Sequence, residues 1–402
     1  MFKTILSLKN ELLKKESSFS IQRFTLIGST LFMSKVVLIL VAYFFDKNDY
    51  NIFNKAYYTA SILILFGSLG FEYALLRVKV KLPYLFMAVA FNSLATLGIL
   101  AIVSPTALTT SESLSVYLYS LFACLGGIFT FGFLFGGDYK KYFMLMVLNS
   151  LFHIAIIPAV KVTGLSIFSC FPFITGAWLL IAVSLTSKHA NGQSNIKELY
   201  KVGASTFIIN SSASFALVAD KYIVNHFFTL NIANAYTFSW ALTVPLFYIG
   251  NLIEKIIFSS ADIDSPKVVK KSLPLLMLLI LSYLLCVTLV VYFFSEIIPA
   301  SVDLHLLREI FLFMITGYSV YVLFHFPLNG YLFKFLNVDV QKLIAKYSAL
   351  SISILVIAFL VFIGLFGISD FRFLLSLVWI YIFVLLFIKW RLIIRSKNVE
   401  PA

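Results

Sequence analysis

The sequence predicts an all-α protein that crosses a membrane repeatedly, with about 12 transmembrane helices arranged as two lobes of six. Composition is the first reason: 61% of the 402 residues are hydrophobic and 12% are charged, whereas soluble domains have about 25% charged residues. The second is that apolar windows long enough to span a bilayer recur along the whole chain. The third is the placement of Lys and Arg, which alternates from one connection to the next.

The chain begins with a segment, 1–20, that we expect to lie on the membrane surface as an amphipathic helix. Its apolar residues share one helical face and its lysines lie elsewhere, a pattern that suits an anionic cytoplasmic leaflet. The segment has no continuous apolar core or small-residue cleavage site, so it is not read as a secretory signal.

Six apolar windows follow in each half of the chain. The first-half windows are 21–45, 55–76, 82–104, 115–137, 142–160 and 165–187, and the second-half windows are 202–227, 233–258, 273–298, 307–332, 343–366 and 371–390. The expected organisation is an N-lobe over 21–187, a cytoplasmic linker over 188–201, a C-lobe over 202–390 and a cytoplasmic tail over 391–402. An even number of spans per half gives both halves the same orientation.

The basic residues test this count. With both termini in the cytoplasm, 24 of the 31 Lys and Arg residues fall on the inside, five fall on the outside, and Lys35 and Lys221 lie within spans. A miscounted span would scramble this alternation. The net charge of +13 is thereby explained by topology, and it does not indicate a nucleic-acid partner.

The sequence offers no catalytic signature. We find no nucleophile elbow, P-loop, HExxH motif or paired cysteines, and Cys124, Cys170 and Cys286 all lie in apolar windows. We therefore expect no catalytic residue, no metal site and no cofactor. Every connection is too short to fold as a separate domain, so the function is expected to be exercised within the membrane.

One span, inside Gly203–Phe228, carries an unusual polar stripe. At about 3.6 residues per turn its small and polar residues fall within an arc of about 100°; they are Gly203, Thr206, Asn210, Ser214, Lys221 and Asn225. One interpretation is a water-accessible path along this helix. The alternatives are a helix–helix interface, where small polar residues are common, and a Lys221 side chain that snorkels to the membrane surface.

Two lysines and one carboxylate are the main candidates for function. Lys35 lies near the middle of the first window, and an intramembrane lysine is a functional-site hypothesis by default. With Lys221 it would suit an anionic substrate such as a pyrophosphate; structurally, Lys35 would instead pair with an interior carboxylate or carbonyl. Asp220 either neutralises Lys221 or couples transport to protons or sodium.

Four further residues are minor candidates. Glu72 and Glu254 lie at cytoplasmic ends of spans, each close to a base, where they form interfacial pairs or contribute to a gate. His153 and His325 lie within spans, where a histidine either hydrogen-bonds a neighbouring helix or titrates during transport. Prolines also interrupt four windows, at Pro158, Pro172, Pro245 and Pro327.

The two halves echo each other weakly. The segments 34–66 and 219–247 each contain a span with an embedded lysine, a Phe-Phe exit, a short polar outer loop with Asn, and a second span that opens with Tyr and small residues. Such an echo is expected if the lobes are repeats.

Two segments carry a resemblance to a known family: FNKAYYTASILILFGSLGFEYALLR (53–77) and VADKYIVNHFFTLNIANAYTFSWALTVP (218–245). Together with the length and the two six-span halves, they resemble the Wzx-type flippases of lipid-linked oligosaccharides. These form the polysaccharide-transporter branch of the MOP superfamily, which also holds the MATE antiporters. The first segment departs from the family pattern at Asn54 and Ala56, where Gly and Tyr are expected.

The resemblance implies a V-shaped, two-lobe exporter in the bacterial inner membrane. It would move an undecaprenyl-pyrophosphate-linked glycan, such as an O-antigen or capsule repeat unit, to the outer leaflet with proton or sodium coupling. A polysaccharide polymerase and a chain-length regulator would be its further partners. In this interpretation Lys35, Lys221, Asn210 and Ser214 line a cationic cavity. The alternatives are a MATE-like cation or drug antiporter and a membrane-embedded polysaccharide polymerase.

Overall fold

The computed structural model describes residues 38–75, 78, 80–103, 108–135, 138–185, 196–259, 267–335, 338–366 and 370–397. Every regular element in these ranges is helical, which confirms the all-α fold class. Seven helical segments of the described part are long and apolar enough to cross a membrane, judged by length and composition.

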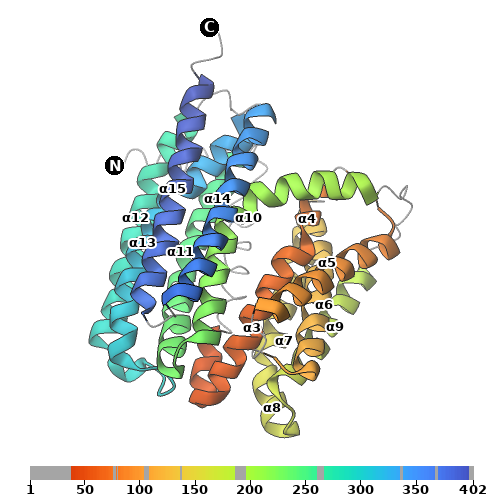
Figure 1. Cartoon of the computed structure of the whole chain (residues 1–402), viewed down its shortest axis with the longest axis vertical. Coiled ribbons are helices and arrows are strands. Elements are labelled where there is room, and N and C mark those ends of the chain that lie inside the picture. The colour runs from red at the N-terminus through yellow and green to blue at the C-terminus, as the bar shows by residue number, and fades with distance from the viewer. Residues whose placement is uncertain are drawn as a thin grey trace.

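The N-terminal group of helices starts with a short helix over 38–44. Its other members are α3 (Lys47–Ser68), α4 (Phe71–Ala74), α5 (Leu82–Val103), α6 (Thr110–Phe135), α7 (Tyr139–Ile154), α8 (Ile156–Thr163) and α9 (Ile167–Leu185). In Figure 1 these helices lie together on the right.

The C-terminal group follows after residue 195. It contains α10 (Ile196–Phe227), α11 (Leu230–Ser259), α12 (Lys267–Phe293), the 3-10 turn η1 (Ser295–Ile297), α13 (Leu304–Phe335), α14 (Val338–Phe366) and α15 (Phe371–Lys397). In Figure 1 most of this group lies on the left, beside the N-terminal group.

Each expected window coincides with helix where the structure describes it, which for the first window means 38–44, although some boundaries differ. The second span begins at Lys47 and not at 55, because Asp46 caps α3 by accepting hydrogen bonds from the amides of Asn48 and Asp49, at 2.9 and 2.8 Å. The expected linker over 188–201 is helical from Ile196 onward, because α10 continues into it. Window 142–160 is divided at Ala155 into α7 and α8.

Proline explains that division but breaks no other described span. Pro158 has no amide hydrogen to donate to the carbonyl of Ile154, four residues earlier, so the α7–α8 joint loses one helical hydrogen bond. By contrast, α9, α11 and α13 continue as helices through Pro172, Pro245 and Pro327. The expectation that these three prolines interrupt their spans was therefore wrong.

The end of α3 requires glycine. Leu69 and Gly70 have φ of 41° and 68°, so the chain leaves the helix through the left-handed region, which is strained for residues with a Cβ. At Gly70 a Cβ would lie 2.8 Å from the carbonyl oxygen of Gly203. The turn after α3 and the start of α10 consequently approach each other backbone to backbone.

Helix α10 connects the two groups. Figure 1 shows its first part lying across the top of the N-terminal group before the helix turns down beside α11. There the Tyr200 hydroxyl donates to the Asn92 side chain of α5 at 3.0 Å, and its ring packs edge-on against Phe71. Farther along, α10 packs against α11, α13 and α3.

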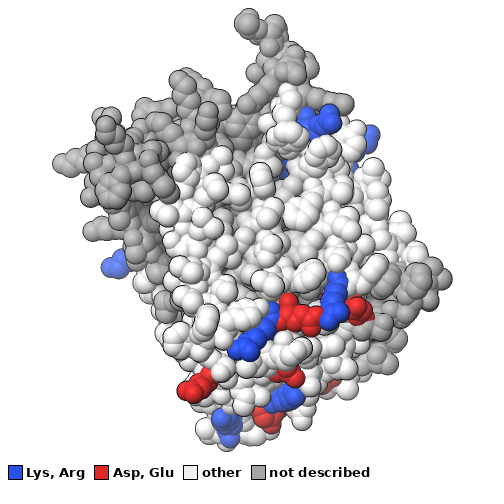
Figure 2. Space-filling view, turned by 90° about the vertical axis from the view of Figure 1, so that its left-hand side faces the viewer, with Lys and Arg blue, Asp and Glu red and all other residues white. Residues whose placement is uncertain are grey.

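Charge is distributed as a membrane protein requires. On the face shown in Figure 2, charged side chains gather near the lower end and a broad uncharged surface lies above them. The N-terminal ends of α13 and α15 contribute one ion pair of this kind, between Arg372 and Glu309. An uncharged band of this extent suits contact with lipid chains.

Candidate functional site: a buried ion pair on α10

Asp220 and Lys221 lie side by side on the part of α10 that packs into the C-terminal group, and both are 0% exposed. The Lys221 Nζ lies 2.8 Å from Oδ1 and 3.0 Å from Oδ2 of Asp220, so the ammonium faces the whole carboxylate. A buried charge is tolerated only when it is paired and hydrogen-bonded. This pair meets both conditions.

The ammonium of Lys221 has three further partners. It donates to the carbonyl of Leu217, one turn earlier, and to the Tyr318 hydroxyl of α13 at 3.0 Å. It also lies 3.8 Å from the centre of the Trp240 ring of α11, a cation–π contact. The helices α10, α11 and α13 thus enclose one positive charge.

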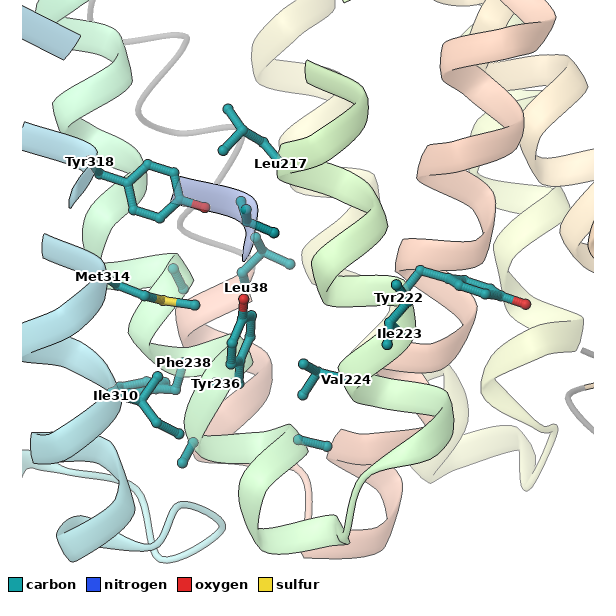
Figure 3. Close-up of a cluster of buried hydrophobic side chains, with 14 of the residues drawn as sticks. Leu38, Leu217, Tyr222, Ile223, Val224, Tyr236, Phe238, Ile310, Met314 and Tyr318 are labelled. Carbon is teal, nitrogen blue, oxygen red and sulfur yellow. The ribbon is translucent and has the colours of Figure 1, made fainter. Parts of the chain in front are cut away.

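The carboxylate of Asp220 is held as well. The Tyr236 hydroxyl of α11 donates to Oδ2 at 2.7 Å, and the Lys221 amide donates to Oδ1 at 2.7 Å. Figure 3 shows Tyr236 and Tyr318 reaching from α11 and α13 toward the space beside α10, near Leu38 and Leu217. One turn below, the Asn225 side chain bonds the Lys221 carbonyl and Thr237 Oγ1, which fixes α10 against α11.

The pair behaves chemically as a neutral, closed unit. Breaking a buried ion pair by removing one partner leaves an uncompensated charge and costs about 3–5 kcal/mol. A proton or a cation that neutralised Asp220 would have the same effect on Lys221, whose ammonium would then need another anion. The arrangement can therefore link the arrival of a cation to the binding of an anion.

Lys221 does not face a wet passage in this structure, contrary to the water-accessible interpretation of its stripe. Its charge is compensated by the adjacent Asp220, and three packed helices exclude water from it. Two other stripe residues with described side chains, Gly203 and Asn225, also pack against protein. For these three residues the helix–helix interface is the arrangement observed.

Several predicted site residues lie outside the described part of the structure. Lys35 precedes residue 38, where the description begins. Asn210, Ser214, Glu72 and Glu254 belong to described helices, but their side chains are not among those described. Their predicted roles therefore remain predictions.

The two histidines lie apart from the ion pair. His153 Nε2 on α7 is 2.8 Å from the Tyr119 hydroxyl of α6, the interhelical hydrogen bond expected of a structural histidine. On α13, His325 Nε2 is 2.9 Å from the Asn329 amide nitrogen, and Asn329 Oδ1 accepts from the buried Lys389 of α15 at 3.2 Å. The second cluster joins α13 to α15.

Sequence reasoning missed the aromatic partners of the pair. Tyr236 and Trp240 belong to the segment 218–245 that carries the resemblance, so a helical reading of that segment would place both on the face toward α10. Tyr318 lies 97 residues after Lys221 in the sequence, and nothing in the window around Tyr318 indicates that it contacts the ion pair. Among the described residues, no group of three or more His, Cys, Asp and Glu side chains is placed to hold a metal ion.

No protein-family model and no curated protein matches the sequence. Among solved structures, the chain is similar to one described as the inward-facing conformation of a multidrug resistance MATE family transporter of the MOP superfamily. The superposition covers 99% of this chain and 100% of that chain, with a TM-score of 0.56 and 12% sequence identity. The fold of this chain is accordingly MATE-like.

Proposed function

We propose that this chain is a transporter of the bacterial inner membrane that flips an undecaprenyl-pyrophosphate-linked oligosaccharide from the cytoplasmic to the outer leaflet. The MATE-like fold over the whole chain supports a transporter, and so does the absence of catalytic motifs from the sequence. The resemblance of 53–77 and 218–245 to Wzx-type flippases supports the lipid-linked substrate.

The buried charges carry the choice of an anionic substrate. Among the described side chains, the buried charged ones are Asp220, Lys221 and Lys389, so lysines outnumber carboxylates. An exporter of cationic drugs needs the opposite balance, because a cation is drawn to buried carboxylates. A pyrophosphate suits a protein whose buried side chains carry a net positive charge.

We propose that the Asp220–Lys221 pair couples ion entry to substrate binding. When a proton or sodium ion neutralises Asp220, Lys221 loses its counter-charge and attracts the pyrophosphate or an acidic sugar. Release of the substrate restores the pair. Lys35, on the first span, contributes a second positive charge to the same passage, and the two groups of helices rock to expose it alternately to each side.

Complementation tests this proposal. A strain that lacks its own flippase accumulates single lipid-linked repeat units on the cytoplasmic leaflet, and expression of this chain is expected to restore surface glycan. Lys35→Ala is expected to abolish export while leaving membrane abundance intact. Asp220→Asn is expected to slow export and to change its dependence on pH or sodium.

The same strain separates the rival functions. A MATE-like antiporter would protect cells from cationic dyes such as ethidium without restoring glycan. A polymerase would restore long glycan chains to a strain lacking polymerase, in which single repeat units already reach the outer leaflet. Either outcome, with no rescue of the flippase-deficient strain, contradicts the proposal.

A further inference from the structure

Three polar side chains on successive turns of α3 are buried without hydrogen-bond partners. They are Tyr50, Asn54 and Tyr58, which are 0%, 0% and 2% exposed. Within the described part of the chain, the hydroxyls of both tyrosines and both polar atoms of Asn54 have no partner at ordinary hydrogen-bond geometry, although the Tyr50 hydroxyl lies close enough to Asn54 for their side chains to interact. Each unsatisfied buried polar group costs stability, so each calls for an explanation such as a functional role or an ordered water.

Comparison of the two halves shows that Asn54 lacks the polar partner on the preceding helix that its counterpart in the C-terminal half has. The helix 38–44 and α3 are separated by two residues after Phe44, just as α10 and α11 are separated by two residues after Phe227. In this register Asn54 corresponds to Thr237, whose partner is Asn225. The residue of the first half that corresponds to Asn225 is Ala42, which has no polar side chain, so the C-terminal half satisfies its polar position and the N-terminal half does not.

The stripe faces the other group of helices. Tyr58 lies within electrostatic range of Asp220, Tyr236 and Tyr318. The flank of α3 that carries Phe53 faces its own group, since Phe53 contacts Phe171 of α9. Tyr58 is therefore buried where α3 approaches the C-terminal group, and Asn54 and Tyr50 continue the same line toward the start of α3.

Hydrogen bonds hold this contact closed at its outer end. The Asn234 amide of α11 donates to the carbonyls of Lys47 and Ser301, at 2.9 and 3.2 Å. Ser301, in the connection before α13, donates its hydroxyl to the Ala42 carbonyl at 2.6 Å. Both side chains are buried, and both satisfy carbonyls at or near the break between 38–44 and α3. We refer to Asn234 and Ser301 together as the outer clasp.

The same face of α3 becomes accessible toward its cytoplasmic end. Ser61, Leu65 and Ser68 continue the line of Tyr50, Asn54 and Tyr58 at helical spacing, and all three are half-buried. This face of α3 is thus fully buried in its outer half and more accessible in its inner half. A passage that is closed on the outside has this pattern.

We propose that Tyr50, Asn54 and Tyr58 line the outer half of the substrate passage and become wet when the outer clasp opens. The inference rests on the proposed transport function and names the chemistry of its outer half: two phenol rings and an amide, which suit the hydroxyls and ring faces of a sugar. In the closed state shown here these groups lack partners, and water or the glycan supplies them after opening.

Thiol labelling tests the proposal. In a background in which Cys124, Cys170 and Cys286 are replaced, Asn54→Cys is compared with Ala56→Cys, a position that is also 0% exposed and lies on the other face of the same helix. A membrane-impermeant maleimide is added from the outside to right-side-out vesicles. Asn54→Cys is expected to label and Ala56→Cys to stay unlabelled.

Opening the clasp provides the second arm. Asn234→Ala removes a side chain that joins the two groups, so the open state should gain population by up to about tenfold, and labelling of Asn54→Cys should rise by that factor. Ala56→Cys should remain unlabelled in the Asn234→Ala background. If its labelling rises as much as that of Asn54→Cys, the Asn234→Ala variant has unfolded, and Ser301→Ala is used in place of Asn234→Ala. Tyr58→Cys is the second reporter should Asn54→Cys fail to reach the membrane.

The outcome separates this inference from the proposed function. If neither Asn54→Cys nor Tyr58→Cys labels faster than Ala56→Cys, with or without the clasp, the stripe is static packing and the inference is overturned, whether or not the chain restores glycan export. If the stripe labels but glycan export is never restored, the passage exists and the proposed substrate is wrong.

Discussion

At the scale of single residues, the protein buries a lysine away from water and surrounds its ammonium with a carboxylate, a hydroxyl and an aromatic ring. Lys221 is compensated by Asp220, by the hydroxyl of Tyr318 and by the face of Trp240. These partners come from three helices, so the positive charge also fixes how α10, α11 and α13 pack. Removal of any one partner should therefore affect stability as well as transport.

The first prediction concerns this pair. Asp220→Asn and Lys221→Met should each lower stability by about 3–5 kcal/mol, because each leaves a buried charge uncompensated. The double variant should be less destabilised than the sum of the two. Thermal unfolding in detergent gives the comparison, and additive losses would show that the two charges do not depend on each other.

The Arg372–Glu309 pair is the matched control. Its arginine side chain is 58% exposed, and an exposed ion pair contributes about 0–1 kcal/mol. Glu309→Gln should consequently leave the melting temperature nearly unchanged. A large loss there would mean that detergent, and not burial, determines the effect of charge removal.

At the scale of helices, hydropathy located the spans but not their ends. The windows followed apolar composition, whereas the helices begin and end where backbone groups find partners. The start of α3 is determined by the Asp46 side chain, and α10 starts among polar residues that pack on α5. The polar stripe on α10 was visible in the sequence. Its surroundings were not, because Tyr318 reaches it from a distant span.

The second prediction concerns the start of α3. Asp46→Ala should cost about 1 kcal/mol, because the amides of Asn48 and Asp49 lose the carboxylate that accepts from them. The adjacent exposed residue offers a control, and Asn48→Ala should have little effect. Equal shifts in the melting temperatures of the two variants would argue against a capping role.

At the scale of the whole molecule, the distribution of Lys and Arg predicts an orientation that the helices make testable. A green fluorescent protein fused after Lys397 should fluoresce, because the C-terminus is expected in the cytoplasm. An alkaline phosphatase fused within 299–303, between η1 and α13, should be active because that connection is expected outside. The reverse pattern would invert the topology and move the proposed clasp to the cytoplasmic side.

Contacts between the two groups of helices are what the sequence could not supply. The sequence around each of three such residues has no distinctive feature: Asn234, Ser301 and Tyr58. Their interactions form only when residues far apart in the chain meet. The Phe-Phe pair that ends a helix in both halves was the one local clue. It relates the halves well enough to show that Asn54 lacks the partner that Thr237 has.

The course of α10 has a mechanical consequence. Its beginning is anchored on α5 through Tyr200, and its far end carries Asp220 and Lys221 into the opposite bundle. A helix that packs against both groups must tilt, bend or change its contacts whenever the two groups move relative to each other. Because Asp220 and Lys221 lie on this helix, a change in the relative position of the two groups should alter the surroundings of the pair, and a change of charge at Asp220 should alter how the two groups pack.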